Sequence, residues 1–425
     1  MTLIDIGPIP SGGHSAGATA PRLTERHVLA LGLGVAGLFV VAALAVAVVT
    51  VVGGGSSWAA LHLALAGAAT VAIGAFMPHF AVTLAGTRPA APTQRLIALG
   101  LLGAGGTAVV AGVTLLGGVV AAIGAAAQLI GLTIVGWHTI SPSRDPLARR
   151  HHVVAFAYIV ALIELAAGVA LGGLSAVGVP AVLAAWSILR PAHAWLTLFG
   201  AVSLTIFSTL VYLAPTVLGA RIRASASLFI GLAGMVVGPL LAAIGFALAS
   251  PGVTIAGAAI TAVGGVGQVG FVIDARARRG GYTSEHDWRR VAVGHLLAGT
   301  GWFVAAATAA GIGLLLGAPL RGWSIGVLAV PMVAGWMLQE LVGSWTHLVP
   351  SVTPGDAAAH ARQRRTLAFA SRSRLVAWNA GVALLWAGVG ASIAGAALIG
   401  GATLAGSVAL SVILLARALA VREKR

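Results

Sequence analysis

Ionisable side chains are rare in long apolar stretches, yet this chain has two carboxylates and six histidines in such stretches. The carboxylates are Glu164 and Glu340, and the histidines are His62, His79, His138, His193, His295 and His347. A charge at the centre of a bilayer costs about 2.5–3.5 kcal/mol on insertion scales, so such residues usually bind a cofactor, carry protons or pair with one another. Because the chain has no cysteine, a metal would be held by imidazole, thioether, phenol or carboxylate groups.

The elements that must position these residues are apolar segments. Spanning about 30 Å of hydrocarbon takes about 20 apolar residues, and the chain is 59% hydrophobic and only 8% charged. We therefore predict an all-α integral membrane protein with twelve transmembrane helices. The predicted spans are 27–53, 57–86, 94–116, 118–140, 153–174, 192–218, 226–249, 251–274, 291–317, 322–349, 374–398 and 400–421.

The basic residues predict how these spans are oriented. All Lys and Arg residues except Arg190 and Arg321 fall in the leader, at the chain end or in alternate connections. By the positive-inside rule, both termini are then cytoplasmic. This divides the chain into a flexible cytoplasmic leader (1–26), a twelve-helix membrane domain (27–421) and a basic cytoplasmic tail (422–425). The net charge of +15 is thus explained by loops beside anionic lipid, so we expect a bilayer and no nucleic acid as partner.

Depth in the membrane separates the histidines into two groups. His62 and His193 begin the second and sixth spans, which both enter from the outer face, so they are expected at similar depth near that face and could face each other. His295 and His347 are expected near the inner face. Glu340 precedes His347 by two helical turns on nearly the same helix face. This inner group predicts either a hydrogen-bonded Glu–His cluster or a second metal site, although each histidine could also simply be bonded at a helix end.

Four stretches carry a resemblance to a known family. They are Trp58–Ala69, Pro191–Arg221, Gly294–Gly299 and Gly335–Pro350. These stretches resemble the multi-span membrane region that precedes the cupredoxin domains of actinobacterial copper oxidases. More distantly, that region is similar to the catalytic subunit of haem–copper oxidases and to the NnrS-type haem- and copper-containing membrane proteins.

The resemblance implies roles for particular residues. In the oxidase subunit a haem ligand lies near the outer end of the second helix and a copper ligand near the outer end of the sixth, which His62 and His193 match. The span 226–249 has no histidine, so a complete oxygen-reducing haem–copper centre is not expected. The resemblance therefore implies binding of haem b or copper, for electron transfer or for copper or nitric oxide handling. Arg190 would pair with a haem propionate or with a lipid headgroup.

Two other functions are compatible with the sequence. Glu164 and Glu340 could be the proton-coupling carboxylates of a transporter, since a carboxyl group buried in a bundle can cycle its proton. The chain could also be a non-catalytic membrane partner of a separate cupredoxin or redox protein. For each of these functions we expect a multi-pass protein of the bacterial inner membrane, and the sequence leaves open whether it is an enzyme.

Overall fold

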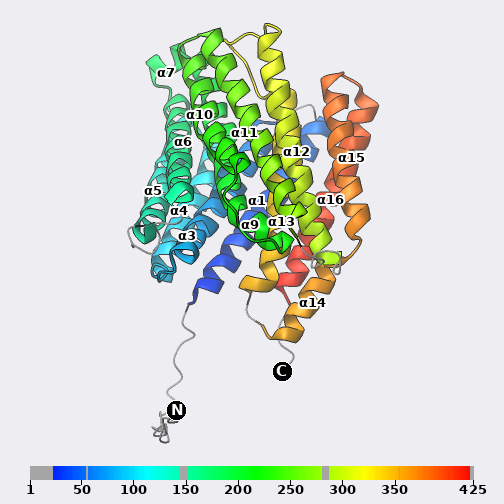
Figure 1. Ribbon diagram of the computed structural model, residues 1–425. Coiled ribbons are helices and arrows are strands. Elements are labelled where there is room, and N and C mark those ends of the chain that lie inside the picture. The colour runs from blue at the N-terminus through cyan, green and yellow to red at the C-terminus, as the bar shows by residue number, and fades with distance from the viewer. Residues whose placement is uncertain (1–22, 54–55, 144–151, 280–286, 354, 422–425) are drawn as a thin grey trace, which may run out of the picture.

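The computed structural model describes residues 23–53, 56–143, 152–279, 287–353 and 355–421. These residues form helices and no strand. Eleven helical segments among them are long and apolar enough to cross a membrane, and they pack into one bundle with a common long direction (Figure 1). The protein is therefore a multi-pass all-α membrane protein, as predicted, with eleven candidate spans in the described residues where twelve were predicted.

The helices follow one another in three successive groups, and the second span of each group contains a π-helical segment. The first group is α1 (Glu25–Gly53), α2 (Trp58–His62), η1 (Leu63–Ala69), α3 (Thr70–Ala85), α4 (Pro92–Ala111), η2 (Gly112–Leu116) and α5 (Gly118–Ser143). The second is α6 (His152–Ala176), α7 (Pro180–Ala184), α8 (Trp186–Ala194), η4 (Trp195–Val202), α9 (Ser203–Leu218), α10 (Ala226–Ala247) and α11 (Pro251–Ala277). The third is α12 (Asp287–Leu315), η6 (Gly326–Leu328), η7 (Val330–Met337), α13 (Leu338–Val352), α14 (Ala357–Ala368), α15 (Ser371–Gly390) and α16 (Ala394–Leu419).

Local sequence explains many of the helix ends. Pro92 and Pro251 occupy the first turns of α4 and α11, where a missing N–H costs nothing. The Asp356 carboxylate accepts a hydrogen bond from the Ala359 N–H and caps α14. Gly86 and Gly219 end α3 and α9 in the left-handed conformation, which glycine adopts without strain.

Each π-helical segment in a second span has a glycine that faces the span before it. A Cβ atom on Gly67 would lie 2.3 Å from Phe39, one on Gly200 would lie 2.6 Å from Glu164, and one on Gly335 would lie 2.7 Å from Trp302. Each glycine therefore makes room for a large side chain of α1, α6 or α12. The same arrangement in all three groups indicates an internal repeat of four helices.

The last two long helices of each group form a tight antiparallel pair. These pairs are α4 with α5, α10 with α11, and α15 with α16, and their contacts are the most extensive between helices in the described residues. Glycines allow this approach: a Cβ atom on Gly257 would lie 2.2 Å from the backbone nitrogen of Ala242, and one on Gly388 would lie 2.3 Å from that of Ala397. Small residues at a helix interface in lipid allow this dispersion-driven packing.

The sixth span begins at Trp186 and not at the predicted residue 192, and the predicted boundary between the last two spans is wrong. The sequence predicts spans over 374–398 and 400–421, whereas α15 ends at Gly390 and α16 already begins at Ala394. Ser392 has a φ of 57° in the short turn between them. Because the residues on both sides of the turn are apolar, the sequence gives no signal for where the turn lies. The helix α15 is also not among the eleven apolar segments; it contains Arg372, Arg374 and Asn379.

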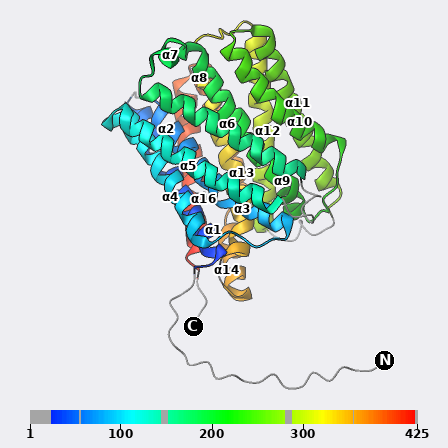
Figure 2. The same ribbon diagram turned by 90° about the vertical axis from the view of Figure 1, so that its left-hand side faces the viewer.

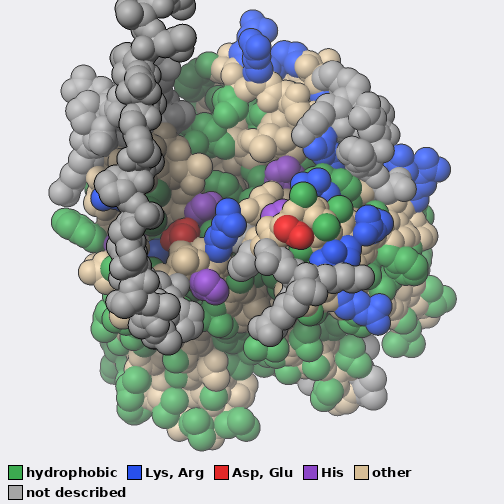
Figure 3. All heavy atoms as spheres, turned by 90° about the horizontal axis from the view of Figure 1, so that it is seen from below, with side chains coloured by type: hydrophobic (Ala, Val, Ile, Leu, Met, Phe, Trp, Pro, Cys, Tyr) green, Lys and Arg blue, Asp and Glu red, His purple; other side chains and the backbone are tan. Residues whose placement is uncertain are grey.

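The two ends of the bundle differ. The helix α1 begins, and α16 ends, at the end where α14 lies, which we call the lower end (Figures 1 and 2). Arginine side chains gather on this face, with histidines among them (Figure 3). The short helix α7 lies at the opposite, upper end (Figure 1).

Candidate functional site

The structure brings His62 and His193 together near the upper end. His62 is the last residue of α2, and His193 lies one residue before the end of α8, so each is followed closely by a π-helical segment. Their imidazole rings have centroids 6.4 Å apart and planes inclined by only 8°. Insertions of this helical type occur frequently at functional sites.

Backbone carbonyl groups fix the orientation of both rings. The His62 Nδ1 atom donates to the carbonyl oxygen of Trp58 at 2.9 Å, and the His193 Nδ1 atom donates to that of Gly168 at 2.8 Å. Because a carbonyl can only accept, the Nδ1 atoms carry the hydrogens, and the neutral rings present the lone pairs of Nε2. A histidine that ligates a metal is commonly held in this way by its other nitrogen.

The two rings line one cavity of about 480 Å³. Its wall is formed mainly by apolar residues of the first and second helix groups, Trp58 and Trp186 among them, and Trp323 of the third group also lines it. The Trp58 ring stacks on His62 with centroids 3.9 Å apart. The site therefore combines two oriented nitrogen donors with an apolar enclosure, as a buried cofactor requires.

Polar side chains besides the histidines also line this cavity, among them Arg190 and Gln128. Arg190 is exposed, and its guanidinium donates to the carbonyl oxygen of Gly322 at 2.7 Å. The Gln128 amide nitrogen donates to the carbonyl oxygen of Ala66, inside the π-helical segment η1, at 2.6 Å. Gln128 thus stabilises the backbone that follows His62, whereas Arg190 places a positive charge beside the cavity.

The donor set is small. Among the described residues there is no group of three or more His, Cys, Asp and Glu residues that could hold a metal ion. A closed tetrahedral zinc site needs four protein ligands, so two histidines alone do not fit one. They do fit a metal that brings its own ligands, as haem does with four ring nitrogens, or a copper ion held by two imidazoles.

The predicted inner group is dispersed over different contacts. His295 is fully buried, and its Nδ1 atom bonds the Gln339 side-chain oxygen at 2.9 Å. The Glu340 Oε1 atom lies 3.1 Å from the Thr300 hydroxyl. His347 instead stacks on Trp288, with ring centroids 6.0 Å apart. The structure therefore gives Glu340 a threonine as its hydrogen-bond partner.

A polar network explains how the less apolar α15 packs in the bundle. The Asn379 side-chain oxygen accepts from Trp302 at 2.8 Å and from Gln339 at 3.1 Å. Trp378 donates to the carbonyl oxygen of Ala334 in η7 at 2.9 Å. Through Gln339 the network extends to His295, which gives this histidine a structural role between α12, α13 and α15.

Glu164 lies in a different setting from Glu340. It is 2% exposed in α6, and neither carboxyl oxygen has a hydrogen-bond partner in the described residues. Its carboxyl group fills the space left by Gly200, where the other groups place Phe39 and Trp302. The carboxyl therefore occupies a packing position of the internal repeat.

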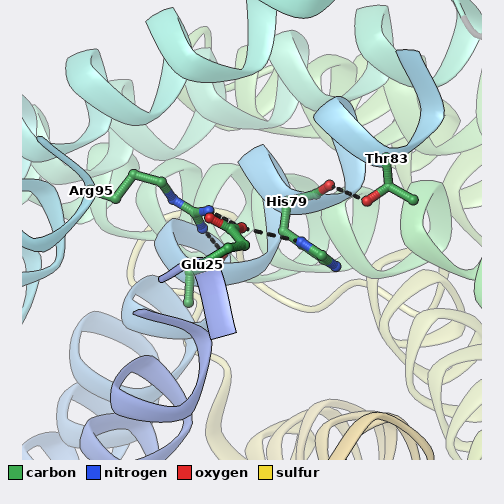
Figure 4. Close-up of polar contacts among 5 residues, drawn as sticks. Glu25, His79, Thr83 and Arg95 are labelled. Carbon is green, nitrogen blue, oxygen red and sulfur yellow. Dashed lines mark hydrogen bonds and ion pairs between the residues drawn. The ribbon is translucent and has the colours of Figure 1, made fainter. Parts of the chain in front are cut away.

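A second polar cluster, at the lower end, was not predicted from the sequence. Arg95, which the sequence places among the loop charges, is only 2% exposed and pairs with Glu25 at the start of α1 (Figure 4). It also donates to the carbonyl oxygen of Ala75. His79 reaches the same carboxylate, with Nδ1 3.2 Å from Oε1. The available signals were Glu25, two residues before the predicted first span, and His79, one of the histidines in the apolar stretches.

Comparison with known proteins adds no family assignment. A scan against protein-family models finds no match, and a search of curated proteins finds none. Fold and site together define the class of the protein: a multi-pass helical membrane protein whose paired histidines line an apolar cavity near one end of the bundle.

Proposed function

We propose that His62 and His193 ligate one cofactor, haem b or copper, and that the protein serves electron transfer or copper or nitric oxide handling. The spacing of the two rings is the observation that carries this proposal. A metal–imidazole bond is about 2.0–2.1 Å long and a ring centre lies about 1.1 Å from each ring atom, so rings on opposite sides of one metal have centroids about 6.3 Å apart. The observed separation is 6.4 Å.

The surroundings of the pair support the same function. The carbonyl partners of both Nδ1 atoms direct lone pairs of Nε2 away from the backbone, and the cavity wall is mainly apolar. If haem is bound, Arg190 is the cation available at this cavity for a propionate. When bound, either cofactor would supply one-electron chemistry, while the protein orients the ligands and limits access of water.

The test is the spectrum and metal content of protein purified after growth with ample haem and copper. For haem, we expect a Soret band in the native protein and its loss in His62→Ala and His193→Ala. For copper, we expect about one equivalent of metal and a tenfold or larger loss in both variants, without a haem spectrum. The exposed His152, first residue of α6, gives the matched control His152→Ala, which should keep the cofactor. Native protein that is colourless and copper-free would contradict the proposal.

We also propose that α15 is a twelfth span and that both termini are cytoplasmic, in a bacterial inner membrane. The internal repeat supports this, because α15 pairs with α16 as α4 pairs with α5 and α10 with α11. A helix of 20 residues is about 30 Å long, which matches the hydrocarbon core. Groups of four spans would all start from the same side, and arginines gather at the lower end (Figure 3).

This topology predicts the result of a labelling experiment. Single cysteines can be introduced into this cysteine-free chain at the exposed Ser373 near the start of α15 and at the exposed Ser392 after its end. A membrane-impermeant maleimide added outside intact cells should label Ser392→Cys at least tenfold faster than Ser373→Cys, with the order reversed in inverted vesicles. Equal labelling from one side would show that α15 does not cross the membrane.

A separate cupredoxin or redox protein is the partner that this function would require, since electrons must reach or leave the cofactor. The cavity lies near the upper end, which the proposed topology places on the outer face. A partner of this kind would therefore act from outside the membrane.

A further inference from the structure

A second, smaller cavity lies between the second spans of all three groups. It is lined by η1 with α3, η4 with α9, and η7 with α13, and has a volume of about 80 Å³. Its wall runs from Ala69, Val202 and Met337 down to Phe80, Leu213 and Leu348. Each helix thus contributes about three turns, and the cavity extends from the middle of the bundle toward the lower end.

Polar atoms without partners belong to two residues that line this mainly apolar space. Glu340 is 2% exposed and its Oε2 atom has no hydrogen-bond partner in the described residues. Thr205, which is 7% exposed and lies on α9, has an unpaired Oγ1 atom. Ser344 lines the same cavity one helical turn below Glu340. The cavity lining thus includes Ser344 and two unpaired buried atoms, those of Glu340 and Thr205, and unpaired buried groups of this kind usually bind water.

The volume is sufficient for this role. A buried water molecule needs roughly 10–15 Å³ of such space and two to four polar partners, so a cavity of about 80 Å³ can hold several. Among the described residues no basic group pairs with Glu340. An unpaired buried carboxylate costs much more than a neutral carboxyl group, so Glu340 holds its proton and can donate it to water.

We propose that this cavity is a hydrated proton-binding site, in which Glu340 exchanges its proton with the lower end of the bundle through water beside Ser344 and Thr205. The site is separate from the histidine pair and does not depend on a cofactor. Glu164 provides the contrast within the same chain, because its carboxyl group is equally buried but packs against Gly200 and lines neither this cavity nor the histidine cavity.

Infrared spectroscopy of the full-length protein in lipid nanodiscs tests the proposal. Protonated carboxyl groups give a C=O stretching band that shifts when the proton is replaced by deuterium, and Glu340→Gln and Glu164→Gln assign the two contributions. After a change from H₂O to D₂O, we expect the Glu340 band to shift at least tenfold faster than the Glu164 band. Equal rates, or the absence of a protonated band that Glu340→Gln removes, would overturn the proposal.

Cysteine accessibility gives a second measurement, which requires the folded protein but no activity assay. Ser344→Cys should react with a small, charged methanethiosulfonate reagent, because only a hydrated thiol forms the reactive thiolate. The control is Thr133→Cys, at an exposed position of α5 at a comparable distance from the lower end of its helix, where lipid surrounds the side chain. We expect at least a tenfold difference in rate. A rate for Ser344→Cys as low as that of Thr133→Cys would contradict water in the cavity.

Discussion

The Glu25→Ala variant is expected to lose about 3 kcal/mol of unfolding free energy, because it leaves the buried guanidinium of Arg95 without its anionic partner. Removing one member of a buried ion pair typically costs 3–5 kcal/mol, and the 22% exposure of Glu25 places this case at the lower limit. The loss can be measured as a shift of the unfolding midpoint in mixed detergent. His79→Ala should cost less, since its contact with Glu25 is longer and His79 is 25% exposed.

A double variant separates the ion pair from simple packing. Glu25→Leu combined with Arg95→Leu removes both charges, and we expect it to be about 2 kcal/mol more stable than Glu25→Ala, in which Arg95 is left unpaired. If Glu25→Ala changed stability by less than about 1 kcal/mol, Arg95 would have another source of compensation. The structure provides only the carbonyl of Ala75 as a further acceptor for this side chain among the described residues.

Two glycine substitutions in the same helix should have clearly different effects. A Cβ atom on Gly257 would lie 2.2 Å from the Ala242 nitrogen and 2.8 Å from the Gly238 oxygen, so Gly257→Ala must push α10 and α11 apart. Overpacking of this kind costs about 1–3 kcal/mol or more, and thermal unfolding in detergent should show it. A methyl group on Gly252, near the start of α11, would meet no other atom within 4 Å. Gly252→Ala should therefore be neutral or stabilising, as alanine favours a helix. Equal effects would show that the α10–α11 contact is not tight.

The sequence predicted those features of the structure that depend on the hydrophobic length of a segment or on the position of a residue within it. Hydrophobic length predicted the membrane-spanning fold, and position within a span predicted that His62 and His193 lie at similar depth, as their 6.4 Å separation shows. Neither prediction needs knowledge of how the helices pack. The metal itself is not decided by these residues, and it stays a prediction.

Other features depend on packing between helices and have no local signal. His193 is oriented by the carbonyl of Gly168, 25 residues away on another helix. Arg95 lies near the start of a predicted span and was counted with the loop charges. Its guanidinium is nevertheless buried, because it donates hydrogen bonds to the Glu25 carboxylate and to the carbonyl oxygen of Ala75. The inner group was predicted from depth alone. Depth does not determine which way a side chain points, so Glu340 meets Thr300 and His347 meets Trp288.

The π-helical segments set the rotational phase of the two histidines. Such a segment amounts to an α-helix with an inserted residue, and η1 and η4 lie directly below His62 and His193. Deleting one residue from either segment would restore α-helical geometry and turn everything above it by about 100° relative to the part below. Because of the π-helical segment, the direction in which side chains of the upper part point differs from the direction that a continuous α-helix would give them relative to the lower part. The histidine pair can face its cavity while the same two spans keep a separate lining for the second, smaller cavity.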